Sequence, residues 1–173
     1  MNEKNCFYKF NVFVIEFVIF SFLGWAYETV YTSVLWGEFA KRGFLHIPVC
    51  PIYGFFCFAL IAIFSSKKLK NPFLIFVAST ILIGTLEYLA SYIIEKALNE
   101  SLWDYSYMNW HINGRVSIVI CLCFGLASVL LIKLVHPLLF KFFSKKLSKA
   151  AAFITALILI AIIFTDTAVT MIQ

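Results

Sequence analysis

The chain has 173 residues, of which 62% are hydrophobic and 13% charged, and its formal net charge is +5. A soluble domain contains about 45 to 50% apolar residues, so this composition excludes a soluble globular protein and indicates an integral membrane protein. The positive charge does not indicate nucleic-acid binding, because basic segments at a membrane surface account for it. We therefore expect membrane lipid, and no nucleic acid, as the partner of the basic segments.

Five apolar segments are long enough to cross a bilayer, for which about 20 residues are needed. They cover residues 10–32, 49–65, 72–95, 115–136 and 150–172. The pattern predicts an all-α fold, a polytopic helical bundle of about five transmembrane helices that forms one integral membrane domain over residues 1–173. The first segment does not match a signal peptide, because it is too long, contains Glu16 and precedes no small-residue cleavage site.

Basic residues are divided unequally between the two sides of this predicted bundle. Because basic loops remain in the cytoplasm, the larger group predicts a cytoplasmic N-terminus and a non-cytoplasmic C-terminus in a multi-pass cell-membrane protein. The larger group is Lys4, Lys9, Lys67, Lys68, Lys70, Lys141, Lys145, Lys146 and Lys149, and the smaller group is Lys41, Arg42, Lys96 and Arg115.

Three carboxylates lie inside separate apolar segments: Glu28, Glu87 and Asp166. At a rise of about 1.5 Å per residue, each lies roughly 21 to 24 Å from the cytoplasmic end of its helix, in the outer half of the membrane. A charged side chain in the hydrocarbon costs about 2.5 to 3.5 kcal/mol, so these groups need partners, protons or water. We expect Glu28, Glu87 and Arg115 to form one polar cluster that opens to the non-cytoplasmic face, since Arg binds a carboxylate through two N–H groups.

The two loops on the predicted outer side carry most of the remaining candidates. Pro48 and Pro51 are typical of an irregular or re-entrant entry into the second segment, which is tolerated where the backbone lines water or is buried in protein. The candidate substrate-binding residues are Trp25, Glu28, Arg42, Tyr53, Glu87, Asp104, Asn113, Arg115 and Asp166.

We expect no metal and no other cofactor. His46 and His111 are the only loop histidines, and loop histidines are more often surface residues than ligands. Cys121 and Cys123 are two residues apart on a predicted helix, so they point to different faces and do not form a paired ligand set.

Short motifs in and around the outer loops resemble a bacterial family. They are Gly24-Trp25 with Glu28, Arg42-Gly43-Phe44-Leu45, Pro48, Cys50-Pro51-Ile52-Tyr53-Gly54, Glu87, Trp103-Asp104-Tyr105-Ser106 and Asn113-Gly114-Arg115. Over about residues 15–135 the chain is similar to the ABC-transporter type IV permeases, which are CmpB-like membrane proteins. His46-Ile47 departs from the family pattern, in which a glycine precedes the proline. The resemblance implies a transport permease and does not name a substrate.

These features predict a permease, or the membrane subunit of one, that moves or binds a small solute or ion through an outward-facing polar cavity. The chain has no Walker motif, so transport driven by ATP needs a separate ATPase subunit. The docking candidates for this subunit are the basic loops on the predicted cytoplasmic side, with the short segment 137–149. Five spans are few for an enclosed path, so we expect a homo-oligomer or a larger complex.

Two alternatives stay open: a structural or regulatory membrane partner without turnover, and an intramembrane enzyme that acts on a lipid-linked substrate. The absence of an HExxH motif and of a clear nucleophile weighs against the enzyme.

Overall fold

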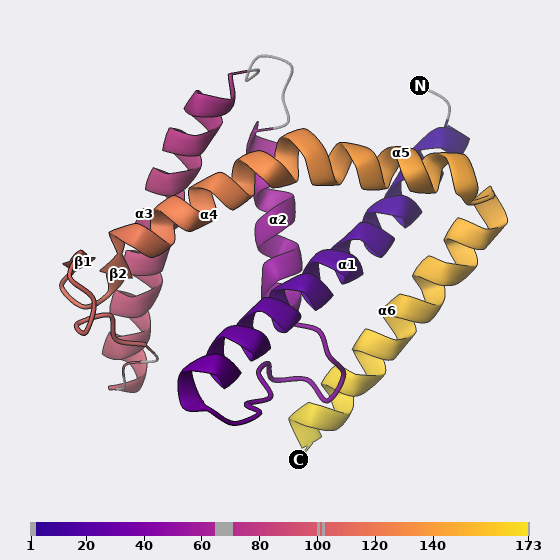
Figure 1. Cartoon of the computed structure of the whole chain (residues 1–173). Coiled ribbons are helices and arrows are strands. Elements are labelled where there is room, and N and C mark those ends of the chain that lie inside the picture. Colours follow the sequence, from indigo (N-terminus) through magenta and orange to yellow (C-terminus); the bar gives the residue numbers. More distant parts are fainter. Residues whose placement is uncertain (1–2, 65–70, 100, 102, 173) are drawn as a thin grey trace. The chain divides into compact units, whose positions relative to one another are not determined.

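The computed structural model describes residues 3–64, 71–99, 101 and 103–172 (Figure 1). In this part of the chain, four helices are long and apolar enough to cross a membrane, and one apolar helix is shorter. The four are α1 (Glu3–Trp36), α3 (Pro72–Leu98), the continuous helix Ile118–Lys146 and α6 (Lys149–Ile172), and the shorter one is α2 (Pro51–Phe64). The predicted all-α fold is confirmed.

The chain divides into two compact units. The first unit comprises Met1–Ala59 and His136–Gln173, and the second comprises Leu60–Val135. The expectation of a single membrane domain over residues 1–173 stays a prediction, because the contacts inside each unit do not decide it.

The fourth predicted span ends later than the sequence indicated. Residues 137–149 were expected to connect two spans, but helix α4 (Ile118–Leu130) continues through a π-helical turn, η1 (Leu131–Val135), into α5 (His136–Lys146). Pro137 and the lysines that follow it are typical of a helix end. The π turn directly precedes Pro137, which lacks an N–H group, and it lets the helix pass the proline without a break.

In the first unit, α1 packs against α5 and α6, and α6 runs beside α1 in Figure 1. Ala152 and Ala156 on α6 are almost fully buried, and such small residues let two helices approach closely in a membrane. The Tyr8 hydroxyl donates to the carbonyl oxygens of Phe143 and Leu147 at 3.1 and 3.0 Å, which joins the start of α1 to the end of α5.

In the second unit, α3 packs against α4, and the loop between them contains a short antiparallel hairpin. Its strands are β1 (His111–Ile112) and β2 (Val116–Ser117). Asn113 and Gly114 both have positive φ, 53° and 70°, and the Arg115 N–H donates to the Ile112 carbonyl oxygen at 3.0 Å. Asn-Gly favours such a turn with two left-handed residues, and three residues separate the paired Ile112 and Val116, although the sequence was interpreted here only as an outer loop.

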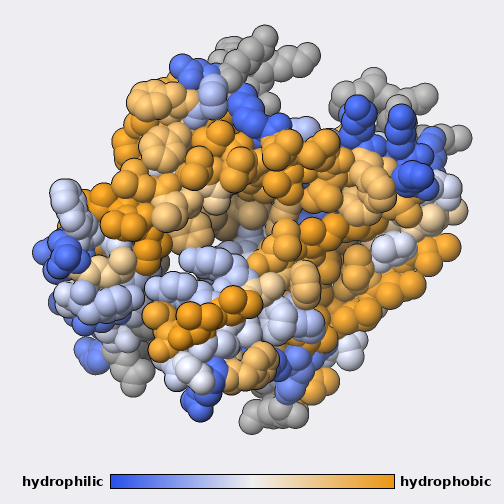
Figure 2. All heavy atoms as spheres, viewed as in Figure 1, coloured by the Kyte–Doolittle hydropathy of each residue, from blue (hydrophilic) through white to orange (hydrophobic). Residues whose placement is uncertain are grey.

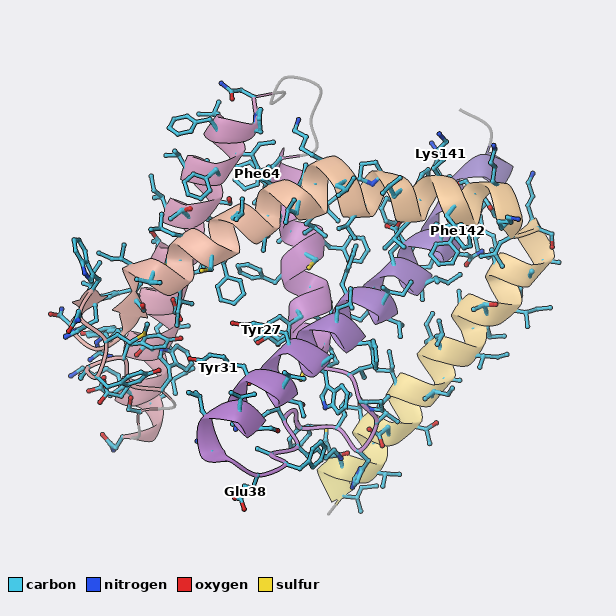
Figure 3. All side chains as sticks on the ribbon, in the orientation of Figure 1. Tyr27, Tyr31, Glu38, Phe64, Lys141 and Phe142 are labelled. Carbon is cyan, nitrogen blue, oxygen red and sulfur yellow. The ribbon has the colours of Figure 1, made fainter. Side chains whose placement is uncertain are left out.

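Large apolar side chains cover the outer faces of the helices. Figure 2 shows hydrophobic residues along the helix surfaces and hydrophilic residues toward the helix ends and loops. Lys141 and Phe142 lie on opposite sides of α5, as Figure 3 shows. Of the basic residues used to predict the orientation, Lys67, Lys68 and Lys70 lie outside the described residues, as does the side chain of Lys4.

Candidate functional site

Glu28, in the C-terminal part of α1, is held by groups that come from the loop after this helix. Arg42 donates through Nε and Nη2 to the Glu28 Oε1 atom at 3.3 and 3.2 Å. The Cys50 thiol lies 3.9 Å from Glu28 Oε2. Both charged side chains are partly exposed, at 41% for Arg42 and 28% for Glu28, so the pair lies at the protein surface and not in its core.

Tyr53 and Trp25 are two further candidates in the same unit. Tyr53, near the start of α2, is within side-chain hydrogen-bonding reach of Glu28. The Trp25 indole Nε1 is buried without a hydrogen-bond partner among the described residues. Gly43 has φ +89°, and a Cβ at this position would lie 2.8 Å from the Cys50 sulfur and 3.5 Å from the Trp25 ring. Glycine therefore allows the loop to close over the site.

Asp166, near the end of α6, binds the same loop at another point. Its Oδ2 atom accepts hydrogen bonds from the backbone N–H groups of His46 and Ile47 at 2.8 and 3.3 Å. The His46 ring nitrogen Nδ1 lies 3.3 Å from Asp166 Oδ1, and Thr170 contacts the same nitrogen at 3.0 Å. Asp166 therefore anchors the loop, and its charge is met by backbone amides.

Glu87, on α3 in the second unit, is contacted by two neutral hydrogen-bond donors. The Tyr105 hydroxyl donates to Oε1 at 2.8 Å, and the Cys121 thiol on α4 lies 3.7 Å from Oε2. Burial, followed by the hydrogen bond to Glu87, raises the pKa of Tyr105 above its usual range, so the phenol stays protonated and keeps donating.

Arg115 does not pair with Glu87. It forms an ion pair with Glu95, two turns further along α3, and donates to the Ser91 hydroxyl at 3.2 Å. Its guanidinium also lies over the Tyr92 ring, 5.6 Å from the ring centre. The predicted cluster of Glu28, Glu87 and Arg115 joins residues of both units and stays a prediction.

Asp104 and Asn113 make contacts that organise the loop between α3 and α4. Asp104 Oδ1 accepts from the Ser106 hydroxyl at 2.6 Å and from the Ser106 N–H at 2.8 Å. These hydrogen bonds, the hydroxyl first, lower the pKa of Asp104. Asn113 donates through Nδ2 to the Tyr88 hydroxyl at 3.2 Å, which ties the hairpin turn to α3.

Several functional candidates were not predicted from the sequence. Cys50 and Cys121 were not among the candidate binding residues, and the pairing of Arg115 with Glu95 was missed. Glu16, whose side chain is fully buried, lies 2.8 Å from His136 at the start of α5. A glutamate in an apolar segment and a histidine at the end of another were the available signals for that pair.

The described residues contain no group of three or more His, Cys, Asp or Glu side chains that could hold a metal ion. A cavity of about 400 Å³ lies on the second unit. Its lining is mostly apolar, with Thr80, Tyr88 and Cys121 among the polar contributors. It therefore differs in character from the polar chamber that the acids led us to expect.

The apolar helices of spanning length, with carboxylates held by loop residues, define a polytopic α-helical membrane protein. Residues 15–171 match the family model described as "Putative ABC-transporter type IV". The chain belongs to this family, as the motifs in its outer loops indicated, and this membership relates it to membrane transport. No curated protein and no solved structure matches the chain.

Proposed function

We propose that this protein is a membrane permease, or the membrane subunit of one, that binds and moves a small solute or ion. The observation that carries the proposal is that Glu28 and Glu87 both contact groups supplied by a connecting loop. Loops that fold back onto carboxylates in the membrane are tolerated where they line a cavity or are buried in protein. An unsupported carboxylate there costs about 2.5 to 3.5 kcal/mol, which packing alone does not justify.

The proposed orientation places the N-terminus in the cytoplasm and the C-terminus outside, and contacts in the first unit support it. Tyr8 joins the start of α1 to the end of α5, so Lys9 and the lysines of α5 gather at one end of this unit. Asp166 joins the last turns of α6 to the loop after α1. The basic end faces the cytoplasm by the rule for basic residues.

A separate ATPase subunit is the proposed partner for driven transport. Helix α5 has no buried residue among those described and carries Lys141, Lys145 and Lys146. The basic end of a helix of spanning length can contact anionic lipid or an acidic partner surface. A homo-oligomer or larger complex completes the proposal, because few spans cannot enclose a path.

The alternative of a structural partner is favoured by one observation: Glu28 already has its counter-charge in Arg42. On that hypothesis the carboxylates stabilise the fold and bind nothing. The two functions predict opposite effects when the carboxylates are neutralised.

Ligand binding to the purified protein in nanodiscs tests the proposal. The protein is screened by thermal shift against inorganic ions and small organic ions, and any stabilising ligand is titrated by calorimetry. We expect Glu28→Gln and Glu87→Gln to weaken binding at least about tenfold, which corresponds to about 1.4 kcal/mol, while both variants remain folded. Glu38→Gln is the matched control, since Glu38 extends from the outer loop (Figure 3). Unchanged affinity in both site variants would favour the structural partner.

A further inference from the structure

Two stretches of the chain repeat one pattern of residues. The pattern starts in one helix and continues, after the loop, at the beginning of the next helix. Its first part recurs 59 positions later: Phe17, Ser21, Glu28 and Thr32 correspond to Phe76, Thr80, Glu87 and Ser91. Its second part recurs 71 positions later: Gly43, Cys50 and Gly54 correspond to Gly114, Cys121 and Gly125. The second outer loop is longer, which accounts for the larger offset.

The corresponding residues make corresponding contacts inside each unit. The Cys50 sulfur lies 3.9 Å from Glu28 Oε2, and the Cys121 sulfur lies 3.7 Å from Glu87 Oε2. Both loop glycines have positive φ, +89° for Gly43 and +70° for Gly114. Sequence position and side-chain contact are independent observations, and they agree.

The two helix crossings agree as well. A Cβ on Gly54 would lie 2.5 Å from the Ser21 hydroxyl and 2.7 Å from the Phe17 ring. A Cβ on Gly125 would likewise collide with Thr80 and would lie 3.2 Å from the Phe76 ring. Each crossing therefore uses a glycine of the second helix against a hydroxyl and a phenylalanine of the first, at corresponding positions.

We propose that residues 12–59 and 71–130 are two copies of one helix–loop–helix repeat, and that their carboxylate–thiol pairs are two copies of one site. In this duplicated site the Glu28 copy holds a fixed charge, and the Glu87 copy binds and releases a proton. The inference deepens the proposed function, because it names a proton as the ligand of Glu87, and it rests on the assignment of Glu87 to the transport site.

The difference between the copies comes from one position. Arg42 pairs with Glu28, and the residue that corresponds to Arg42 is Asn113, which carries no charge. Asn113 donates to the Tyr88 hydroxyl instead. The first copy therefore has a cation paired with its carboxylate, and the second copy has an uncharged residue at the corresponding position.

The groups around Glu87 in the second unit are consistent with proton exchange. Tyr105 from the loop and Cys121 from α4 are neutral donors to its two oxygens. Arg115, the charged residue next to β2, is paired with Glu95 on α3. Among the described residues of this unit, Glu87 therefore has hydrogen bonds but no ion pair. A proton that joins the carboxylate removes the uncompensated charge, and its release to water restores it.

Infrared difference spectroscopy between about pH 5 and about pH 9 tests the inference on the full chain in nanodiscs, because surface Asp and Glu stay largely ionised over this range. The carbonyl stretching band of a protonated carboxyl group is recorded. We expect such a band to change with pH in the wild type, to be absent in Glu87→Gln, and to persist in Glu28→Gln. The band should shift in Tyr105→Phe, which keeps the carboxyl group and removes its phenol donor.

Arg42→Gln tests the relation between the copies. It makes the first site resemble the second, so we expect a second pH-dependent band, and that band should vanish in the double variant Arg42→Gln/Glu28→Gln. A band that persists in Glu87→Gln, or no additional band in a folded Arg42→Gln protein, would overturn the inference. The infrared bands report protonation and not transport. If the bands behave as expected but the protein does not transport a solute, only the proposed function is refuted. Transport that continues without any Glu87 band refutes only this inference.

Discussion

Asp104 shows how a single side chain stabilises the loop between α3 and α4. Its carboxylate accepts two hydrogen bonds from Ser106, and these contacts lower its pKa in the folded protein. A carboxyl group with a lowered pKa stabilises the fold fully above its unfolded-state pKa, about 3.9 for Asp, and this contribution is lost as the pH falls through the folded-state value.

We therefore predict that the loop segment of residues 103–117 loses local stability on acidification below about pH 4. The measurement is hydrogen exchange at the Ser106 amide, followed by NMR in nanodiscs and corrected for intrinsic exchange rates. Asp104→Asn should show weaker protection at neutral pH and little further change on acidification. Equal protection of the wild type and Asp104→Asn at every pH would show that the carboxylate does not hold this loop.

At the scale of the helix pair, two glycines set how closely the helices approach. Gly54 faces Ser21 and Phe17 on α1, and Gly125 faces Thr80 on α3, with no room for a methyl group in either case. Gly84 differs, because a Cβ there would meet the Cys121 sulfur at 3.3 Å and little else. Alanine variants at the three positions therefore distinguish the effect of steric overlap from the effect of helix propensity.

We predict that Gly54→Ala and Gly125→Ala each lower the free energy of unfolding by about 1 to 3 kcal/mol, the usual cost of overpacking. Gly84→Ala should be neutral or stabilising, since alanine gains about 1 kcal/mol of helix propensity. Unfolding in mixed micelles, followed by circular dichroism, gives the three values. If Gly84→Ala destabilised as much as the other two, helix crossing would not explain the glycines.

The helices were largely predictable from the sequence, and their partners were not. Apolar runs located α1, α3 and α6 within a few residues at most boundaries, because the length of a span is set by the bilayer. The continuation of α4 through η1 into α5 was missed, because a proline normally ends a helix and a π turn has no local sequence signal. The hairpin at Asn113-Gly114 had a signal that was not used.

Side-chain pairing was predictable only in part. The acids in apolar segments were singled out because a charge in hydrocarbon costs free energy. Arg42 was a candidate binding residue, but its pairing with Glu28 was not predicted. The choice of Arg115 between Glu87 and Glu95 depends on how the hairpin returns to α3, which residue spacing does not determine. The thiols of Cys50 and Cys121 contact Glu28 and Glu87, which lie far away in the sequence, and composition does not predict such contacts.

At the scale of the whole molecule, the proposed function requires that a solute or ion crosses the membrane. Family membership and the spanning helices relate the chain to membrane transport, and we propose that Glu28 and Glu87 take part in it. If the sites serve transport, a change of one carboxylate oxygen to an amide nitrogen should stop flux without unfolding the protein, because Gln matches Glu in shape but cannot carry its charge.

The most direct test is flux into proteoliposomes that contain the full chain together with any ATPase that copurifies with it. A ligand found by thermal shift is followed as a radiolabelled solute or by an ion-selective dye. The account predicts flux above that of empty liposomes, a decrease of at least about tenfold in Glu87→Gln, and wild-type flux in Glu38→Gln. Wild-type flux in a folded Glu87→Gln protein would contradict it.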